Sequence, residues 1–385
     1  MYDIKLSASE EALVAKARYF ATSYLTPRAE QWENDRKMPR EGLREAAKAG
    51  LTGLDSPIAH GGSGTGFNAK LLVLEALAEV DMAFAFSLTN TQGIAGRIAM
   101  DGTESQRERF LADLLSTERL GATALTEPGA GSDFSAIQMN AKKVNGGWLL
   151  NGEKAWITNA AEADIFLVYA QTDPAKRWRG IASFLVDGRQ QGFTRAAPYE
   201  LLGGHAIGTG GFSLTDMFVP DEDLIAQPGD AFKAAMLSIN GARTYVAGML
   251  NAMLHASLFH AVDYATKRQT FGKAIIEHQG LKWSLADVAT KLEASRLLTY
   301  RAAQLVQDDG DAMLAASYAK KFAGDIGIQG IADCIQAMGA NGMRTNIPLG
   351  RHLACAKLAS YTDGSTEIQN ERIGASLTDI VAKTV

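Results

Sequence analysis

A glycine-rich run and a nearby tryptophan are the parts of this chain whose residue types could do chemistry. The run extends over Ala124–Asp133 and carries Thr126 and Ser132, and Trp156 follows with Thr158 two residues later. Glycines let a backbone approach a large planar or phosphorylated ligand, and hydroxyl and bare N–H groups are the donors that a pyrophosphate needs. The run therefore indicates a loop for an anion or a cofactor, although its Glu-Pro-Gly triplet alone is ordinary turn chemistry.

Other familiar chemical devices are missing from the sequence. It has no G-x-x-x-x-G-K-[ST] loop, no G-x-G-x-x-G after a strand, no H-E-x-x-H and no G-x-S-x-G. Cys334 and Cys355 make no spaced pair, and His255 and His260, five residues apart, do not share a helix face well. We therefore expect neither a disulfide framework nor a metal site. The glycines of 61–66 either cradle a phosphate or form a surface loop between helices.

Composition limits the class of protein. A chain of 385 residues with 46% hydrophobic content is long enough for two or three domains with a large core. The net charge is -5 and no block of basic residues is present, so a nucleic-acid partner is not expected. The N-terminus lacks a signal or transit pattern, and no apolar run approaches the ~18 residues that span a bilayer. We expect a soluble, cytoplasmic protein without a membrane partner.

The elements that must position these residues fall into three parts. Residues 1–119 are helical in pattern, 120–228 carry short apolar strands with Asn-Gly turn signals, and 229–385 are helical again. The long amphipathic segments of the third part lie near 231–269, 279–307, 312–340 and 366–383. Because strands and helices do not alternate, a doubly wound sheet is excluded. The sequence predicts an α+β fold with an N-terminal helical domain, a central antiparallel β domain and a C-terminal helical bundle.

Short motifs along nearly the whole chain resemble those of the acyl-CoA dehydrogenase family. Two of them are the glycine-rich run and the Trp-Ile-Thr-Asn segment that starts at Trp156. The others are Leu150–Lys154, Ile239–Arg243, Arg268–Lys273, His278-Gln279, Lys321–Asp325, Gln336–Gly342 and Asp363–Gln369. So many matches in one order are specific for the family fold and less specific for the reaction.

The resemblance implies an activity, a cofactor and partners. It implies an FAD-dependent acyl-CoA dehydrogenase with a C-terminal four-helix bundle, which removes the α proton of an acyl thioester while the β hydrogen leaves as hydride to flavin N5. In such an enzyme the cofactor carries the redox step, and the protein supplies alignment and electrostatics. It also implies an electron-transfer flavoprotein as electron acceptor and a homotetramer built as a dimer of dimers.

The same resemblance assigns roles to individual residues. The residues that match contacts with the flavin ring, with the cofactor phosphates or with the adenine half across a subunit boundary are Leu125, Thr126, Ser132, Trp156, Thr158, Arg268, Phe271, Gln279, Gln336, Gly339, Ser365 and Glu367. The residues that match positions near the thioester substrate are Ser132, Asn240, Arg243 and Gly364. Taken alone, Arg268 is a solvated helix charge, and a structural ion pair is the alternative role of Arg243.

The catalytic base is where this sequence departs from the family. Many members place a Glu before the Gly of the last motif, where this chain has Asp363, and others place one before the arginine matched by Arg243, where this chain has Ala242. Asp363 is therefore the expected base, in an apolar pocket that raises its pKa and beside donors that stabilise charge on the thioester oxygen. Asp is shorter than Glu by roughly 1.5 Å, and such a reach error costs about 100-fold in rate unless backbone or substrate moves closer. The alternative is a turn that caps the next helix.

Further departures leave the acyl group and its carrier open. Asn240 stands where an Asp is frequent, His205 replaces an Arg, and Ala354-Cys355 replaces an Arg-Asp pair. The alternative functions are an enoyl-thioester reductase or acyl-carrier-protein dehydrogenase, a nitroalkane-oxidase-like enzyme or monooxygenase, and a flavoprotein without turnover.

Overall fold

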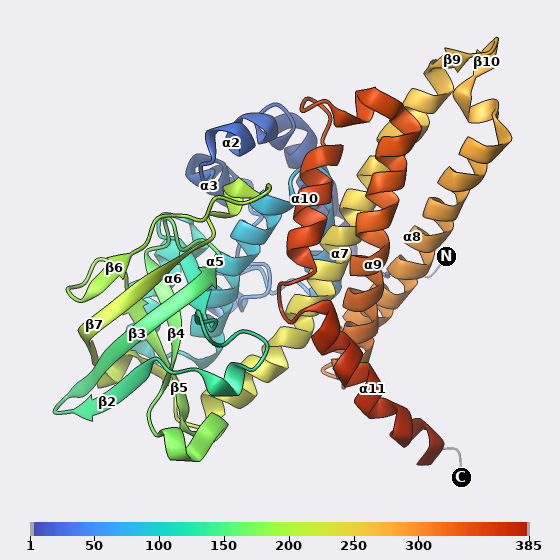
Figure 1. Ribbon diagram of the computed structural model, residues 1–385. Helices are drawn as coiled ribbons and strands as arrows, with labels where there is room; N and C mark the ends of the chain where they lie inside the picture. Colours follow the sequence, from blue (N-terminus) through green and yellow to red (C-terminus); the bar gives the residue numbers. More distant parts are fainter. Residues whose placement is uncertain (1–3, 383–385) are drawn as a thin grey trace.

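The computed structural model describes residues 4–382 and has three parts. A sheet lies on one side, a layer of helices from the N-terminal part covers it, and a bundle of long helices forms the other side (Figure 1). The pattern changes from helix to strand between Leu115 and Gly121, and back to helix between Ala226 and Asp230. The domain limits that we expect, 119/120 and 228/229, fall in these two connections.

The N-terminal part contains six α-helices. Thr103 begins the last of them with a capping box, in which its hydroxyl accepts the Gln106 N–H and the Gln106 side chain accepts the Thr103 N–H. Asp81 caps the start of the fifth helix by accepting the Phe84 N–H at 3.0 Å. The helices are α1 (Ala8–Phe20), α2 (Ala29–Asp35), α3 (Arg40–Lys48), α4 (Phe67–Ala78), α5 (Met82–Asp101) and α6 (Glu104–Leu115).

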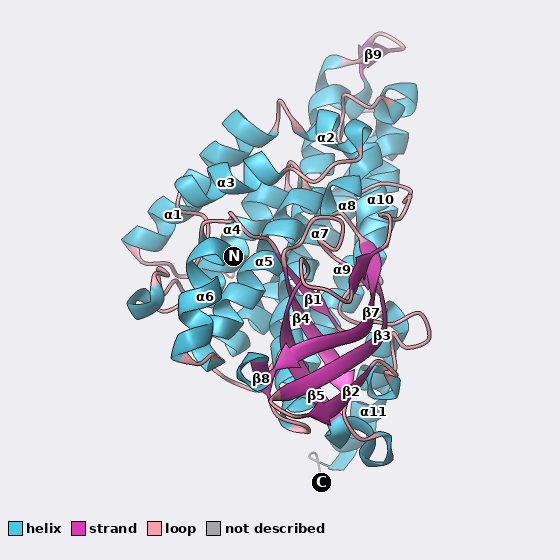
Figure 2. Ribbon diagram, turned by 90° about the vertical axis from the view of Figure 1, so that its left-hand side faces the viewer, coloured by secondary structure: helices cyan, strands magenta, loops and turns pink. Residues whose placement is uncertain are grey.

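The central part is one sheet in the order β6-β7-β3-β2-β4-β5-β8, with β1 added at β4. Its strands are β1 (Gly121–Ala124), β2 (Asn140–Val144), β3 (Gly147–Ile157), β4 (Ile165–Gln171), β5 (Ile181–Asp187), β6 (Phe193–Arg195), β7 (Gly210–Pro220) and β8 (Leu224–Ala226). Most pairs are antiparallel, as expected, but β1 runs parallel to β4, and a single bridge joins β2 and β4 in parallel. Figure 2 shows the strongly twisted sheet beside the helices.

The C-terminal part is built on three long helices, α7 (Asp230–Lys267), α8 (Gln279–Gln307) and α9 (Met313–Met338), which pack side by side (Figure 1). A small hairpin of β9 (Gln269–Thr270) and β10 (Lys273–Ala274) joins the first two. The shorter α10 (Leu349–Ala359) and α11 (Thr366–Ala382) pack against α9. These long helices confirm the expected amphipathic segments.

The hydrophobic core joins the parts into one molecule. The largest buried cluster combines residues of α1, α4 and α5 with residues of α7, α8 and α9. Another cluster lies between α5, α6 and the strands β4 and β5, so these helices cover one face of the sheet. Among residues 4–382, no helix is long and apolar enough to cross a membrane.

Candidate active site

The start of the glycine-rich run is tied to strand β3. The Leu125 carbonyl accepts a hydrogen bond from the Lys154 Nζ at 2.9 Å, and the Thr126 carbonyl accepts one from the Ala155 N–H at 3.1 Å. The Lys154 ammonium also forms a buried ion pair with Glu127 at 2.8 Å. Glu127 in turn accepts two backbone N–H groups just before β2. The predicted contacts of the loop are therefore held on rigid strands.

Trp156 lies at the end of β3, where the pairing with β7 is irregular. Its φ is +59°, a conformation that is uncommon for a bulky residue and points to a local requirement. The indole is 61% exposed and packs against the Tyr199 ring at a centroid distance of 4.5 Å. An exposed, rigidly held aromatic ring beside the partly buried Thr158 suits a planar ligand. Ser132 is exposed in the loop nearby.

Asp363 lies in the turn between α10 and α11. Its φ is +52° and that of Gly364 is +94°, so two successive residues have left-handed backbone conformations. The Arg243 Nε donates to the Asp363 carbonyl at 3.0 Å, and the Lys320 Nζ donates to the Gly364 carbonyl at 2.8 Å. The Asp363 carboxyl itself is partly buried and makes no hydrogen bond or ion pair within the described part of the chain. It is thus a carboxyl held in place but not engaged.

The electrostatics of this turn combine burial with two cations. Burial raises the pKa of the Asp363 carboxyl above its ordinary value, while the charges of Lys320 and Arg243 act in the opposite direction. Burial lowers the pKa of Lys320 to about 8, against the attraction of Asp363. Burial and the nearby Arg372 lower the pKa of Arg243 to about 10. A raised carboxyl pKa is the condition that proton abstraction near neutral pH requires.

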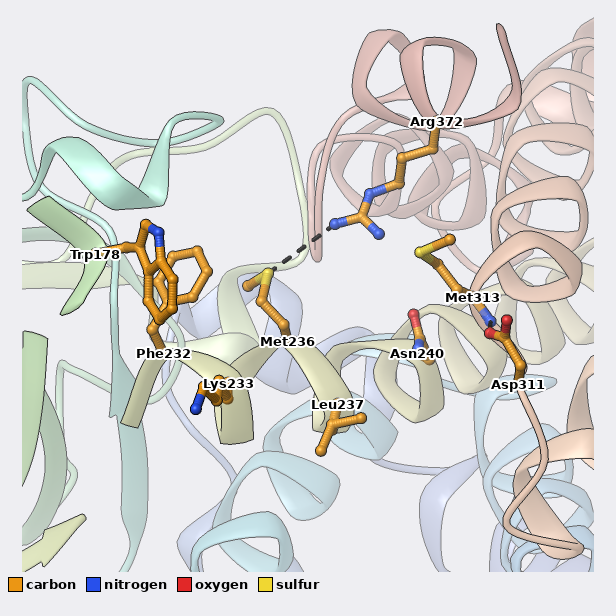
Figure 3. A pocket seen from close by; sticks show the side chains of 9 residues that line it. All are labelled: Trp178, Phe232, Lys233, Met236, Leu237, Asn240, Asp311, Met313 and Arg372. Atoms are coloured by element: carbon orange, nitrogen blue, oxygen red, sulfur yellow. Dashed lines mark hydrogen bonds between the residues drawn. The ribbon is translucent and has the colours of Figure 1, made fainter. Parts of the chain in front are cut away.

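A cavity of about 540 Å³ lies near this turn, and Arg243 connects the two. Its wall includes Asn240, whose Oδ1 accepts a hydrogen bond from the Arg243 Nη1 at 3.3 Å. Arg372 faces the cavity, and its guanidinium donates a hydrogen bond to the Met236 sulfur at 4.0 Å (Figure 3). Apolar side chains dominate the lining, which is made by Trp178, Phe232, Lys233, Met236, Leu237, Asn240, Asp311, Met313 and Arg372. The cavity lies between the sheet, the start of α7 and α11.

The remaining predicted cofactor contacts lie in two other places. Ser365, partly buried, and Glu367, exposed, are at the start of α11, next to Asp363. A second group is exposed at the far end of the bundle, around the β9–β10 hairpin and the end of α9; it consists of Arg268, Phe271, Gln279, Gln336 and Gly339. The hydrogen bond from Asn341 to the Tyr264 hydroxyl, at 2.9 Å, shows that the ends of α7 and α9 meet there.

The distance between the two groups follows from helix geometry. Arg268 comes 25 residues after Arg243, and helix α7 rises about 1.5 Å per residue, so roughly 38 Å of helix separates them. One dinucleotide cannot contact both groups in a single chain. The predicted adenine contacts at the hairpin therefore lie on a separate surface from the Asp363 turn, and the cavity near Asn240 is lined neither by them nor by the predicted contacts of the flavin ring.

Sequence reasoning missed several residues that shape the site. Three buried side chains donate or accept hydrogen bonds at the Asp363 turn or at the glycine-rich loop, and none of them was predicted as a site residue: Lys320, Gln369 and Glu127. The available signal was a charged residue on the apolar side of a predicted helix, which is where Lys320 falls. Its neighbour Lys321 is instead partly exposed and pairs with Asp325. Sequence alone does not say which of two adjacent lysines points inward.

The two glycines before His205 approach Ala354 and Cys355, which are departures from the family pattern. A Cβ on Gly203 would lie 2.7 Å from the Ala354 Cβ, and one on Gly204 would lie 3.3 Å from the Cys355 Sγ. His205 follows these glycines, and its ring is held by a carboxylate of the N-terminal part at 2.9 Å. These positions therefore pack a loop against α10, and small side chains at 354 and 355 permit the close approach.

The three parts of the chain match three family models. Residues 7–118 match the N-terminal domain of acyl-CoA dehydrogenase, 122–217 the middle domain and 229–378 the C-terminal domain. This chain belongs to the acyl-CoA dehydrogenase family. The family resemblance and the fold expected from the sequence are thus confirmed, as are the class of enzyme, an oxidoreductase acting on CH–CH bonds, and FAD as its cofactor.

Relatives and solved structures agree with this membership. The acyl-CoA dehydrogenase of Bacillus subtilis (strain 168) is 34% identical over 362 residues, which cover 94% of this chain and 96% of the relative. Butyryl-CoA dehydrogenase from Megasphaera elsdenii is similar in structure with a TM-score of 0.93 and 32% identity, covering 98% of this chain and 100% of the other. A structure of PigA with FAD and proline has a TM-score of 0.93 and 28% identity, covering 98% and 99%.

Proposed function

We propose that the protein oxidises the α,β bond of an acyl-CoA thioester and that Asp363 is the base that takes the α proton. When bound, FAD accepts the β hydrogen as hydride. The residues at the ends of β1 and β3 fit this group, since Leu125 and Thr126 begin a loop that is anchored to β3, and Trp156 on β3 presents an exposed ring. The expected contacts of Leu125, Thr126, Ser132, Trp156 and Thr158 with the flavin half are part of this proposal.

The unpartnered carboxyl of Asp363 is the observation that carries the proposal. A structural turn residue would spend its carboxylate on a helix cap or an ion pair, but that carboxylate makes neither contact within residues 4–382. Its left-handed φ turns the short side chain in a direction that an ordinary helical or extended residue would not give. The proton moves from the substrate α carbon to a carboxylate oxygen of Asp363, and this leaves the C–H electron pair to form the new double bond.

We propose that the cavity near Asn240 admits the pantetheine arm of the acyl-CoA substrate. Its wall combines apolar side chains with the Asn240 amide and the Arg372 guanidinium, which suit a flexible arm that carries amide groups. Gly364 and Arg243 remain candidates for substrate contact, and Arg243 already holds the Asp363 carbonyl and the Asn240 amide. Arg243 therefore orients the residues that face the substrate.

We also propose a homotetramer in which one protomer's far-end group completes its partner's cofactor site. The separation along α7 and the exposure of Phe271, which is 96% exposed, support this assembly. Arg268, Gln279, Gln336 and Gly339 would contact the adenine half, with Ser365 and Glu367 near the same dinucleotide. An electron-transfer flavoprotein is the proposed acceptor of the electrons.

Anaerobic mixing of the FAD-loaded protein with a panel of compounds tests the reaction. The panel is butyryl-CoA, glutaryl-CoA, a carrier-bound prolyl group and nitroethane, and the readout is bleaching of the flavin absorbance. We expect bleaching by an acyl-CoA, and a 10²–10⁴-fold slower reaction in Asp363→Asn because a positioned base contributes about that much. FAD content and thioester binding should be unchanged in the variant.

Two results would contradict the proposal. Bleaching by nitroethane but by no thioester would make the protein an oxidase of nitroalkanes. Equal rates for Asp363→Asn and the unmodified protein would remove Asp363 from the reaction. A third result, bleaching by the carrier-bound group alone, would correct only the substrate. The acyl group would then be attached to a carrier protein and not to CoA, and Asp363 would remain the proposed base.

A further inference from the structure

Three buried donors hold the turn that carries Asp363. The Arg243 Nε donates to the Asp363 carbonyl at 3.0 Å, and the Gly364 carbonyl accepts from both the Lys320 Nζ, at 2.8 Å, and the Gln369 Nε2, at 3.0 Å. These three side chains are 1%, 2% and 0% exposed, in that order. They come from α7, α9 and α11, so three helices fix one turn.

Two of these donors are cations, and among residues 4–382 no carboxylate forms an ion pair with either. The hydrogen bonds of Lys320 all go to backbone carbonyls, those of Gly364 and, at 3.4 Å, Ser360. A buried ammonium with carbonyl partners alone is costly, because its desolvation is repaid only by a nearby negative charge. The negative group that acts most strongly on Lys320 is the Asp363 carboxyl. The lysine therefore has an electrostatic partner that it does not touch.

We propose that Lys320 is a positioning residue that holds the Asp363 turn through its hydrogen bonds and keeps the Asp363 carboxyl ionised through its charge. The inference rests on the proposed role of Asp363 as base. Lys320 does not contact the substrate in this proposal. It acts through the carboxyl that does.

The charged groups around the turn determine the expected direction of its pH dependence. Lys320 on α9 and Arg243 on α7 both lower the pKa of Asp363, which burial raises. Arg372 and Glu367, both on α11, act on these cations and not directly on the carboxyl.

One titratable neighbour responds to Asp363 without controlling it. Burial raises the pKa of the Tyr245 phenol and the Asp363 charge acts in the same direction, so this phenol is neutral in the working range. Removing the Lys320 charge must therefore raise the pKa of Asp363, so that the base becomes ionised only at higher pH.

The rate of flavin bleaching by butyryl-CoA, measured across pH in the FAD-loaded protein, tests the proposal. For Lys320→Met we expect the midpoint of the acidic limb to rise by about one pH unit or more, since an opposite charge at short range shifts a carboxyl pKa by that amount. Well above pH 8 Lys320 itself loses its proton, so the charge effect should disappear there and only the pH-independent rate loss caused by the missing hydrogen bond to the Gly364 carbonyl should remain. An unchanged midpoint would overturn the charge role.

Two control variants separate charge from geometry. Gln369→Met removes a neutral donor to the same Gly364 carbonyl, so it should lower the rate at every pH and leave the midpoint in place. Lys321→Met removes the neighbouring lysine, which pairs with Asp325 on the outside of α9, and should change neither. A midpoint that moves equally in Gln369→Met and Lys320→Met would assign the effect to turn geometry. Should Lys320→Met fail to retain FAD, Lys320→Gln keeps a donor without the charge and is tested in its place.

A measurement without substrate distinguishes failure of this inference from failure of the proposed function. Infrared difference spectra of the FAD-loaded protein across pH report protonation of Asp363, assigned by the band that Asp363→Asn lacks. If no acyl thioester bleaches the flavin, the proposed function fails, but the Lys320→Met shift of this band remains measurable. An Asp363 band that titrates identically in both proteins would end the inference, whatever the substrate.

Discussion

At the scale of single residues, Asp363 combines two unfavourable features. It has a left-handed backbone conformation, and its carboxyl is partly buried without a hydrogen-bond partner in the described chain. Strained conformations of this kind cost on the order of 1–3 kcal/mol and persist where the surroundings enforce them. Arg243, Lys320 and Gln369 are those surroundings. These features agree with the proposed role of Asp363 as base, in which a reactive position is kept at the expense of stability.

Replacing this residue should stabilise the protein. Burial raises the pKa of Asp363 in the folded state, so its contribution to stability is present at low pH and is lost as pH rises through the folded-state pKa. Asp363→Asn resembles the protonated form and tolerates positive φ. We expect the free energy of unfolding to increase at pH 7, and the gain to vanish on acidification. Thermal denaturation of both proteins at several pH values checks this, and a variant less stable at pH 7 would contradict it.

The candidate site residues could be named from the sequence at this scale, but the residues that surround them could not. The motifs identified Trp156 and Asp363 because each belongs to a short run of neighbouring residues. Two of the three donors that hold the Asp363 turn come from distant parts of the sequence: Lys320 is 44 positions from Gly364, and Arg243 is 120 positions from Asp363. No local pattern records such a contact.

At the scale of elements, the buried pair of Lys154 and Glu127 links strand β3 to the glycine-rich loop. Lys154 is fully enclosed, and its Nζ serves both Glu127 and the Leu125 carbonyl. Burial lowers the pKa of Lys154 to about 8, against the attraction of Glu127. The pair therefore couples the position of the loop to strand β3, which carries Trp156.

Breaking this pair should damage both folding and cofactor retention. Lys154→Met leaves Glu127 as an unpaired buried charge, which typically costs about 3–5 kcal/mol. We expect the urea midpoint to fall and FAD to be released at lower urea than in the unmodified protein. The double variant Lys154→Met with Glu127→Gln should recover part of the loss, because no charge is then left unpaired. Equal stability of the single and double variants would show that the ion pair is not the link.

The element pattern itself was largely readable from the sequence. The segments 231–269, 279–307 and 312–340 have sustained helical periodicity, and α7, α8 and α9 cover them closely. The short α10 and the parallel pairing of β1 with β4 were not foreseen. Their neighbours come from distant parts of the chain, so tertiary packing and not local periodicity defines them.

At the scale of the whole molecule, the exposed far end of the bundle indicates an assembly. Phe271 is almost fully exposed at the tip of the β9–β10 hairpin, in a left-handed conformation. We expect Phe271→Ser to reduce the mass measured by light scattering from that of a tetramer and to lower FAD occupancy. Met100→Ser, which removes another exposed apolar side chain at the end of α5, is the control and should change neither. A monomeric unmodified protein with full FAD would exclude the shared site.

Helix α7 also fixes the distance between the Asp363 turn and the β9–β10 hairpin. One end lines the cavity at Asn240 and holds the Asp363 turn through Arg243, and the other leads into the hairpin after Lys267. Deleting one residue between them would rotate one end by about 100° relative to the other and shorten the spacing by about 1.5 Å. The interval from Arg243 to Arg268 is therefore fixed by the mechanics of a single rod, and length changes that a surface loop absorbs cannot be absorbed there.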